Sequence, residues 1–304
     1  MWLPRFLPLL AIAALAQQPD SGVNVRHIIG LENIKPNALG KLAIRDGALQ
    51  FESQAKIPVA SIDDIFTGAE ITQSGGKAGT VAKTAAMAAP YDSGAALSLL
   101  LRTKVDMLTV SYRETSGARH AAIFALPKGQ AEAIRTQLIA AGAHTSAAPP
   151  ALKEARSVTE TAGKKSLTIG PSLPALQIEL VEIGDIRIPA EFRSAIYERL
   201  IEQVNKTGKF QKVFRSGDRA AASYPNLITL HTTVQKFKQG SQMQREITTV
   251  LGSTKVDVNT MVTARGGEAL FDRDVQGKVR FFGENLGATY DLAKRIAKVL
   301  RQSF

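Results

Sequence analysis

A stretch that is poor in large apolar side chains divides this chain of 304 residues into two parts. Residues 145–172 contain Pro149-Pro150 and Gly170-Pro171, and they offer little that would fill a hydrophobic core. Proline and glycine interrupt regular structure, and this composition is typical of an interdomain linker. We therefore expect two folded domains, residues 23–144 and residues 173–304, each of an ordinary domain size.

A second break in composition lies inside the first of these domains. Residues 74–96 are rich in glycine and alanine, and they interrupt a region whose other patterns predict strands. We expect a loop or a short helix inserted into the domain. Two interpretations stay open for the overlapping residues 78–104: a packed helix or plain loop, and a mobile helix that binds a partner.

The first sixteen residues have the layout of a secretory signal peptide. Arg5 supplies a positive charge, residues 6–16 carry no charged or polar side chain, and the run ends in Ala14-Leu15-Ala16 before a polar stretch. This run is shorter than the about 20 apolar residues that a membrane-spanning helix needs. We expect cleavage after Ala16 and a periplasmic or secreted protein. An uncleaved anchor and a ragged apolar N-terminus are the alternatives.

Composition narrows the partners of such a protein. The chain has no cysteine, which excludes disulfides, thiolate chemistry, cysteine-ligated zinc and a lipid on an N-terminal cysteine, and which favours a bacterial periplasm. The formal net charge is +11, but the basic residues are interspersed with acids. A nucleic-acid partner is not expected, because such binders carry a concentrated basic stripe. An anionic membrane surface or a cell-wall polymer fits the charge better, and a solvated basic surface is the alternative.

The first domain begins with patterns of short strands. Residues 39–44 and 48–51 flank Asp46-Gly47, a pair that tolerates the positive φ values of a tight hairpin turn. Residues 57–62 are predicted to form a further strand. Asp63-Asp64 would follow that strand as a turn or a helix N-cap, with the two side chains pointing to opposite faces.

The first domain ends with a hairpin and a helix. Residues 108–112 alternate apolar and polar side chains, the chain turns at residues 115–117, and residues 120–126 run back with Ile123 and Phe124 on opposite faces. Pro127 is predicted to open a helix. The apolar positions of this helix and its C-terminal cap are Ala131, Ile134, Leu138, Ala141 and Gly142.

This order of short strands, a final hairpin and one closing helix resembles the pleckstrin-homology and GRAM type of domain. The residues that carry the resemblance are residues 39–44 with Asp46-Gly47, Ile57-Pro58, and residues 108–112 leading to the helix. The resemblance covers the first domain and is one of topology. It implies a small bent sheet capped by a helix, and a lipid or membrane surface is one partner that we weigh for it.

The spacing of apolar residues in the second domain predicts the order strand, helix, four strands, helix. Pro189 begins the first helix, which carries an apolar face and ends at Gly208. The predicted strands are residues 176–183, 210–214, 227–237, 255–263 and 269–275. The last helix covers about residues 286–300, with Tyr290, Ala293, Ala297 and Leu300 on its inner side. The fold class is therefore α+β, with a mixed sheet and two helices on one face of it.

Residues 173–304 resemble a domain of unknown function found in small bacterial envelope lipoproteins, which shares its fold with the amino-terminal domain of TolB and the curli-secretion lipoprotein. The matching positions are Gly208-Lys209-Phe210, Val234, Phe237, Gly240, Arg245, Gly252, Lys255-Val256, Val258, Gly267, Val275 and Gly277-Lys278. The lipidated cysteine of that family is absent, and Ala264-Arg265-Gly266 stands where the family often has an acid before the glycine. The resemblance implies an envelope protein, without implying a membrane anchor here.

Motifs of catalysis and metal binding are missing from the sequence. Gly163-Lys164-Lys165-Ser166 lacks the upstream glycine of a phosphate-binding loop, and no G-x-G-x-x-G or G-x-S-x-G occurs. Asp272-Arg273-Asp274 would place two carboxylates on one strand face, as a general acid/base pair or, as we expect, an exposed strand edge. The histidines are isolated, so each is expected to be structural or exposed and not a metal ligand: His27, His120, His144 and His231.

The sequence thus predicts an exported envelope protein without enzymatic activity. We expect no catalytic, cofactor-binding or metal-binding residues and no cofactor. The predicted role is a binding or adaptor module for a partner protein or a cell-wall component. The alternatives are a peripheral membrane protein that binds lipid through the first domain and, with less support, an unrecognised periplasmic hydrolase, because no nucleophile–base motif is present.

Overall fold

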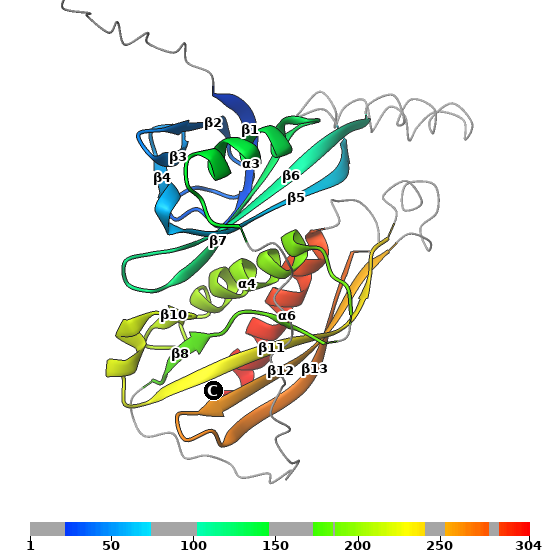
Figure 1. Cartoon of the computed structure of the whole chain (residues 1–304). Helices are drawn as coiled ribbons and strands as arrows, with labels where there is room; N and C mark the ends of the chain where they lie inside the picture. The colour runs from blue at the N-terminus through cyan, green and yellow to red at the C-terminus, as the bar shows by residue number, and fades with distance from the viewer. Residues whose placement is uncertain (1–21, 74–101, 146–172, 185, 241–252, 280–285) are drawn as a thin grey trace, which may run out of the picture.

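The computed structural model describes residues 22–73, 102–145, 173–184, 186–240, 253–279 and 286–304. These residues form a mixed α+β fold with two β-sheets and three α-helices (Figure 1). The predicted signal peptide, the glycine- and alanine-rich residues 74–96 and all but the first residue of the predicted linker lie outside the described part of the chain. Within the described ranges, no helix combines the length and the apolar character that crossing a membrane requires.

The first sheet has seven strands in the order β4-β3-β2-β1-β7-β6-β5, and all neighbours are antiparallel. The helix α3 (Gln130–Ala140) packs on it. The strands are β1 (Val23–Ile29), β2 (Leu39–Arg45), β3 (Ala48–Phe51), β4 (Ala55–Pro58), β5 (Ile62–Gln73), β6 (Arg102–Arg113) and β7 (Arg119–Pro127).

The start of this sheet confirms one prediction and corrects two. Asp46 and Gly47 form the tight turn between β2 and β3, with φ values of 51° and 69°. Residues 57–62 are not one strand, because a 3-10 turn (Val59–Ser61) separates β4 from β5, and the Ser61 hydroxyl donates a hydrogen bond to the Pro58 carbonyl that closes it. Asp63-Asp64 lie inside β5 and form neither a turn nor a helix cap.

The helix α3 begins later than the sequence predicts. Pro127 is the last residue of β7, and the helix starts at Gln130, after Gly129 with a φ of 84°. The carboxylate of Asp106 on β6 accepts hydrogen bonds from the amides of Gly129 (2.6 Å) and Ala131 (3.4 Å), so a side chain from a distant strand caps this helix. The predicted apolar positions Ala131, Ile134 and Leu138 are buried, and Gly142 follows the helix end with a φ of 98°. The fourth predicted position, Ala141, is exposed and lies just after the last helical residue, Ala140.

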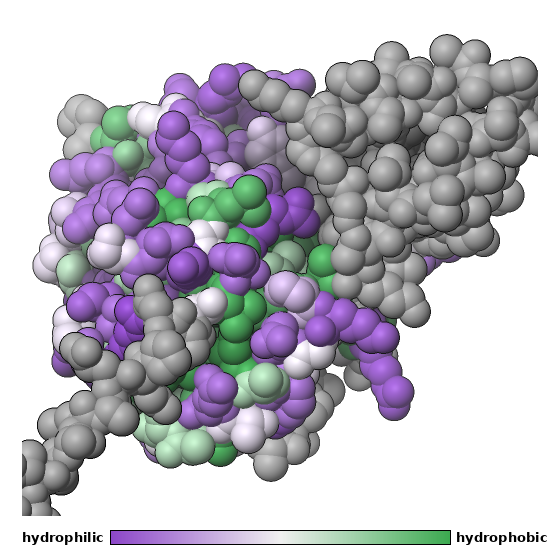
Figure 2. Space-filling model, turned by 90° about the horizontal axis from the view of Figure 1, so that it is seen from above, coloured by the Kyte–Doolittle hydropathy of each residue, from purple (hydrophilic) through white to green (hydrophobic). Residues whose placement is uncertain are grey.

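A groove of about 780 Å³ lies between α3 and strands β2 and β3. Apolar side chains line part of it, among them Leu42, Leu49 and Ile134. Figure 2 shows the molecule from above, and on this face hydrophobic surface lies between hydrophilic side chains. Leu42, Leu49 and Ile134 themselves are almost completely buried, so these three side chains add little apolar surface to the groove.

The second sheet is mixed, with the order β10-β8-β11-β12-β13 and β9 beside β11. Strands β8, β9, β10 and β11 pair in parallel, whereas β11, β12 and β13 pair antiparallel. The strands are β8 (Ala175–Ile178), β9 (Glu182–Ile183), β10 (Val213–Arg215), β11 (Leu227–Lys238), β12 (Thr254–Ala264) and β13 (Ala269–Val279). The helices are α4 (Ala190–Asn205) and α6 (Gly287–Ser303), and a 3-10 turn (Arg219–Ser223) follows β10.

The elements of the second half follow the predicted order, with two corrections. The predicted strand 176–183 is split into β8 and β9. Tyr290 does not lie on the inner side of the last helix: it is 42% exposed, and the Arg199 guanidinium lies 5.5 Å from its ring centre. The start of α4 after Pro189 is confirmed. The buried residues on the predicted helix faces are Phe192, Ile196, Leu200, Val204, Ala293, Ala297 and Leu300.

The two sheets meet in a common hydrophobic core, with α4 lying between the first sheet and the second (Figure 1). Ile28, Met107 and Ile123 of the first sheet join the same apolar cluster as the helices α4 and α6 and the second sheet. Phe124, the neighbour of Ile123, belongs to the separate cluster beneath α3, as the predicted alternation requires. This packing does not confirm a division of the chain into two domains.

Candidate functional site

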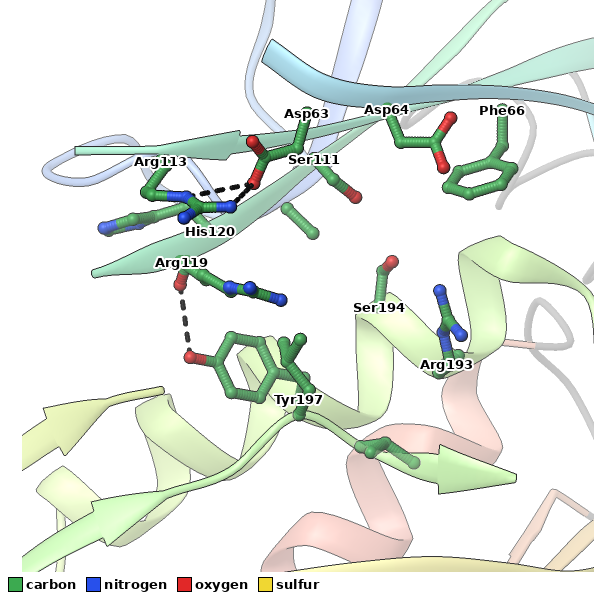
Figure 3. Close-up of a pocket in the computed structure, with 13 residues that line it drawn as sticks. Asp63, Asp64, Phe66, Ser111, Arg113, Arg119, His120, Arg193, Ser194 and Tyr197 are labelled. Atoms are coloured by element: carbon green, nitrogen blue, oxygen red, sulfur yellow. Dashed lines mark hydrogen bonds and ion pairs between the residues drawn. The ribbon is translucent and has the colours of Figure 1, made fainter. Parts of the chain in front are cut away.

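A cavity of about 400 Å³ lies between the first sheet and α4 (Figure 3). Strands β5, β6 and β7 form one wall, and α4 forms the opposite wall together with the apolar side chains Leu180 and Val181. Its polar lining includes three arginines, namely Arg113, Arg119 and Arg193. Its acidic lining comes from Asp63 and Asp64 on β5.

Strand geometry determines which side chains of the first sheet reach the cavity. Side chains alternate between the two faces of a strand, and residues directly opposite each other in an antiparallel pair share a face. Ser111 pairs with Ala121 and Arg113 pairs with Arg119, so all four face α4. A register shift in β5 after Ile62 acts as a bulge and lets Asp63 and Asp64 both line the cavity, whereas the sequence predicted opposite faces.

The charges in the cavity are unevenly paired. Arg113 donates to the Asp63 carboxylate at 3.0 Å, and both side chains are close to half exposed. Arg119 and Arg193 have no hydrogen-bond or ion-pair partner for their guanidinium groups among the described residues. Burial lowers the pKa of Arg193, and the negative charge of Asp64 partly offsets this. The cavity therefore holds two guanidinium groups, one of them substantially desolvated, that make no hydrogen bond or ion pair with the described residues, although the charge of Asp64 acts on Arg193.

A buried polar network holds the β7 side of the cavity against α4. Glu198 is 3% exposed, and its carboxylate accepts hydrogen bonds of 2.9 Å from the Ala121 amide and from the Arg215 guanidinium. Burial raises the pKa of Glu198, and the charge and hydrogen bond of Arg215 oppose that rise. The Tyr197 hydroxyl donates to the carbonyl of Arg119 (3.1 Å) and accepts from the Ser216 amide (2.9 Å). These contacts fix the backbone that carries Arg119.

The tip of the β6–β7 hairpin is bound to the turn after β10. The Arg219 amide donates to the Ser116 carbonyl (3.1 Å), and the Arg219 guanidinium donates to the carbonyls of Ser116 and Thr115. The Arg119 amide donates to the Ser216 carbonyl (3.0 Å). Because backbone groups of both halves are joined directly, the β6–β7 hairpin, which carries Arg119 of the cavity, has a defined position against the second half.

The structure separates the histidines that the sequence singled out. His27 is buried beside Phe51 and Phe124, and His231 lies 3.2 Å from the Thr263 hydroxyl. His144 is exposed after α3. His120 is buried on β7 at the edge of the cavity, but its ring stacks on that of Tyr112, on the strand face opposite to Arg119.

The predicted acidic pair of β13 lies on the second sheet. Asp272 and Asp274 do share a face, and both accept hydrogen bonds from the side-chain amide of Asn259, at 2.7 Å and 3.2 Å. Both acids are exposed, as expected for a strand surface. Neither acid lines the cavity. Residues 163–166 lie outside the described part of the chain.

Sequence reasoning did not find the cavity arginines or the buried Glu198. The helical pattern of α4 contains a weak signal for Glu198, because a charged residue lies among apolar positions that are all buried. Arg119 and Arg193 carry no local signal, since they meet only through the packing of β7 on α4. Chemically, two guanidinium groups with free donors, beside the Ser194 side chain, fit a carboxylate or a phosphate.

Comparison with solved structures finds similarities at low identity. A Xanthomonas campestris protein of the family DUF330 is 10% identical over 43% of this chain and 86% of its own, with a TM-score of 0.29. The PelC dodecamer from Paraburkholderia phytofirmans is 11% identical over 44% and 94%, with a TM-score of 0.34. A homologue of a neuraminyllactose-binding hemagglutinin from Helicobacter pylori is 9% identical over 47% and 88%, with a TM-score of 0.25. No family model and no curated protein matches the chain.

Proposed function

We propose that this protein is a binding module without enzymatic activity, and that its cavity takes an acidic group, a carboxylate or a phosphate, of a partner. The observation that carries the proposal is the pair Arg119 and Arg193, which face one cavity and make no hydrogen bond or ion pair through their guanidinium groups with the described residues. The charge of Asp64 acts on Arg193 without forming such a pair. The size of the cavity, about 400 Å³, is within the range of small-ligand sites. A terminal group or a short side chain of a larger partner would fill it.

The energetics favour an anion over a neutral ligand. A guanidinium that is partly removed from water loses hydration, and an unpaired buried charge is costly. The lowered pKa of Arg193 expresses this cost. A carboxylate or phosphate returns the lost interactions through bidentate hydrogen bonds, which are roughly twice as strong as neutral ones. Binding of an anion would therefore replace the interactions with water that the guanidinium groups lose when the protein folds.

The proposed setting is the bacterial cell envelope, and the proposed partner is an envelope protein or a cell-wall component. Residues 1–16 support export by their signal-peptide layout. We propose a fold of the PH/GRAM type for the first half, which has seven antiparallel strands and α3, and a fold like the TolB amino-terminal domain for the second half, which has a mixed sheet with α4 and α6. The mass of the protein recovered from the periplasm tests export, with Gln17 as the expected first residue.

The experiment for the cavity is a titration of the full-length protein, followed by the NMR signals of the arginine side-chain N–H groups. Inorganic phosphate and succinate are the two probes. We expect saturable shifts for Arg119 and Arg193, and their loss in the variants Arg119→Gln and Arg193→Gln. Arg295→Gln is the matched control, because Arg295 is an exposed arginine on α6. Equal responses in the control and the two cavity variants would overturn the proposal.

A further inference from the structure

We propose that Glu32, Glu114 and His120 form a binding site for a divalent transition-metal ion of the zinc type. One ligand atom from each of these three side chains lies within 4.8 Å of the other two. The residues come from three places in the chain: the loop after β1, the β6–β7 hairpin and β7 itself. The inference is independent of the anion site, because His120 shares its strand face with Tyr112 and not with the cavity arginines.

The state of the His120 ring is the observation that points to a ligand. The side chain is completely buried, and neither of its ring nitrogens has a hydrogen-bond partner in the described structure. Its Nε2 lies 3.1 Å from the Glu114 carboxylate, without the geometry of a hydrogen bond. Stacking on Tyr112, at 5.0 Å between ring centres and 18° between planes, holds the ring in this orientation.

The other buried histidine shows what an ordinary structural role looks like. His27 is also fully buried, but its Nε2 accepts a hydrogen bond of 3.1 Å from the Leu31 amide. Buried polar atoms in folded proteins are almost always satisfied in this way, and leaving one unsatisfied costs about 1–3 kcal/mol. A metal ion bound at Nε2 of His120 would give that nitrogen its partner.

The charges around His120 suit a cation. Glu32 and Glu114 are both exposed carboxylates, so each can turn toward an ion without losing a buried contact. Arg215 is the nearby positive charge that acts on His120, and it is already engaged with Glu198 at 2.9 Å. Arg215 and a hydrogen bond from the Ser116 side chain also act on Glu114, but neither Glu32 nor Glu114 forms an ion pair with a lysine or arginine among the described residues.

The ligand set determines the class of ion. Imidazole favours zinc, copper, iron and nickel over magnesium and calcium, which prefer sites made of oxygen alone. One nitrogen and two carboxylate oxygens complete three positions of a tetrahedral zinc site, and water would take the fourth. Zn²⁺ is therefore the probe to use, and Mg²⁺ is the ion that this site should reject.

The first experiment is calorimetric titration of the full-length protein, stripped of metal with EDTA, with Zn²⁺. We expect one saturable site, at least about tenfold weaker in Glu32→Gln and in Glu114→Gln, because loss of an outer-shell partner alone costs 10–100-fold. Glu268→Gln and His144→Gln are the controls, since both residues are exposed outside the cluster. The glutamate variants alter exposed side chains, so their folding is not in question.

A second readout identifies the ligand nitrogen directly. The NMR signals of the imidazole nitrogens should show Zn²⁺ shifting Nε2 of His120 and no other histidine. Absence of saturable binding, binding that is equal in the two glutamate variants and the controls, or a shift confined to His144 would overturn the proposal. Saturation by Mg²⁺ at the same concentration would overturn the assignment to a transition-metal ion.

Discussion

Gly117 at the tip of the β6–β7 hairpin lies against Gly217, the residue that follows Ser216 after β10. A Cβ atom placed on Gly117 would lie 2.5 Å from the Gly217 carbonyl oxygen, and one placed on Gly217 would lie 2.7 Å from the Gly117 carbonyl oxygen. Both residues have positive φ values, 92° and 80°. This close approach joins the first sheet to the second half of the chain beside the cavity.

We therefore expect Gly117→Ala to destabilise the protein by more than backbone strain alone. Gly129→Ala is the matched control, because Gly129 also has a positive φ, 84°, but a Cβ atom placed on it would meet nothing within 4 Å. The control should lose about 1–2 kcal/mol of unfolding free energy. Gly117→Ala should lose a further 1–3 kcal/mol, roughly the cost of overpacking. Equal urea denaturation curves for the two variants would show that the contact does not constrain the fold.

Removal of the Glu198 side chain should be among the most damaging single changes. Glu198→Ala leaves the guanidinium of Arg215 buried with no counter-charge, which costs about 3–5 kcal/mol in other proteins. Arg295→Ala, which breaks an exposed ion pair with Asp291, should cost less than about 1 kcal/mol. The free energy of unfolding in urea compares the two. A small loss in Glu198→Ala would mean that water reaches Arg215.

Arg193→Met should change stability and binding in opposite directions. Burial opposes the charge of Arg193, so an apolar side chain of similar length should raise the unfolding free energy of the ligand-free protein by about 0.5–2 kcal/mol. The same variant should lose the response to inorganic phosphate. Lys298→Met, an exposed position on α6, controls for the general effect of a new methionine. A destabilised Arg193→Met would indicate that this arginine supports the fold.

Acidification should destabilise the protein through His27. Burial lowers the pKa of His27 below its usual 6.5, and the hydrogen bond from the Leu31 amide requires Nε2 without a proton. The unfolded chain thus binds more protons than the folded chain as the pH falls below about 6.5, so stability falls with it. The drop in unfolding free energy from pH 7 to pH 5, measured with EDTA present, should be smaller in His27→Gln. It should be unchanged in His144→Gln.

Local patterns in the sequence were sufficient for most elements of the fold. The Asp46-Gly47 turn is confirmed because both residues tolerate positive φ. The start of α4 is confirmed because proline suits the edge of a helix. The long strand β11 shows the predicted alternation, with Ile228, Leu230 and Val234 buried and its polar neighbours turned outward. In each case the structure depends on interactions between residues that are only a few positions apart in the sequence.

The errors arose where distant parts of the chain decide the outcome. Asp106 on β6 caps α3, so the helix begins at Gln130 and not at Pro127. The bulge in β5 follows from its pairing with β6, and it brings Asp63 and Asp64 to the cavity together. No pattern within either segment carries this information, because each depends on the register between strands.

The candidate sites depend even more on packing between segments. Arg119 ends the turn of one hairpin and Arg193 opens a helix of the other half, and neither position is unusual in its own surroundings. His120 is an isolated histidine in the sequence, which predicted a structural or an exposed residue and not a metal ligand. The fold places His120 close to Glu32 and Glu114, and only this placement makes the three residues a possible set of metal ligands. Sequence spacing does not reveal such a meeting when the three residues come from separate elements.

The position of α4 has a consequence for how the protein is made. Residues 190–205 cover the side of the first sheet on which Ile28, Met107 and Ile123 lie. The ribosome completes this sheet before it adds the helix that covers it, and nascent chains lengthen by only about 5–20 residues each second. For several seconds the first half of the nascent chain therefore exposes a hydrophobic sheet face that can associate with other proteins. Chaperones or a channel that keeps the chain extended would protect that face until its own helix arrives.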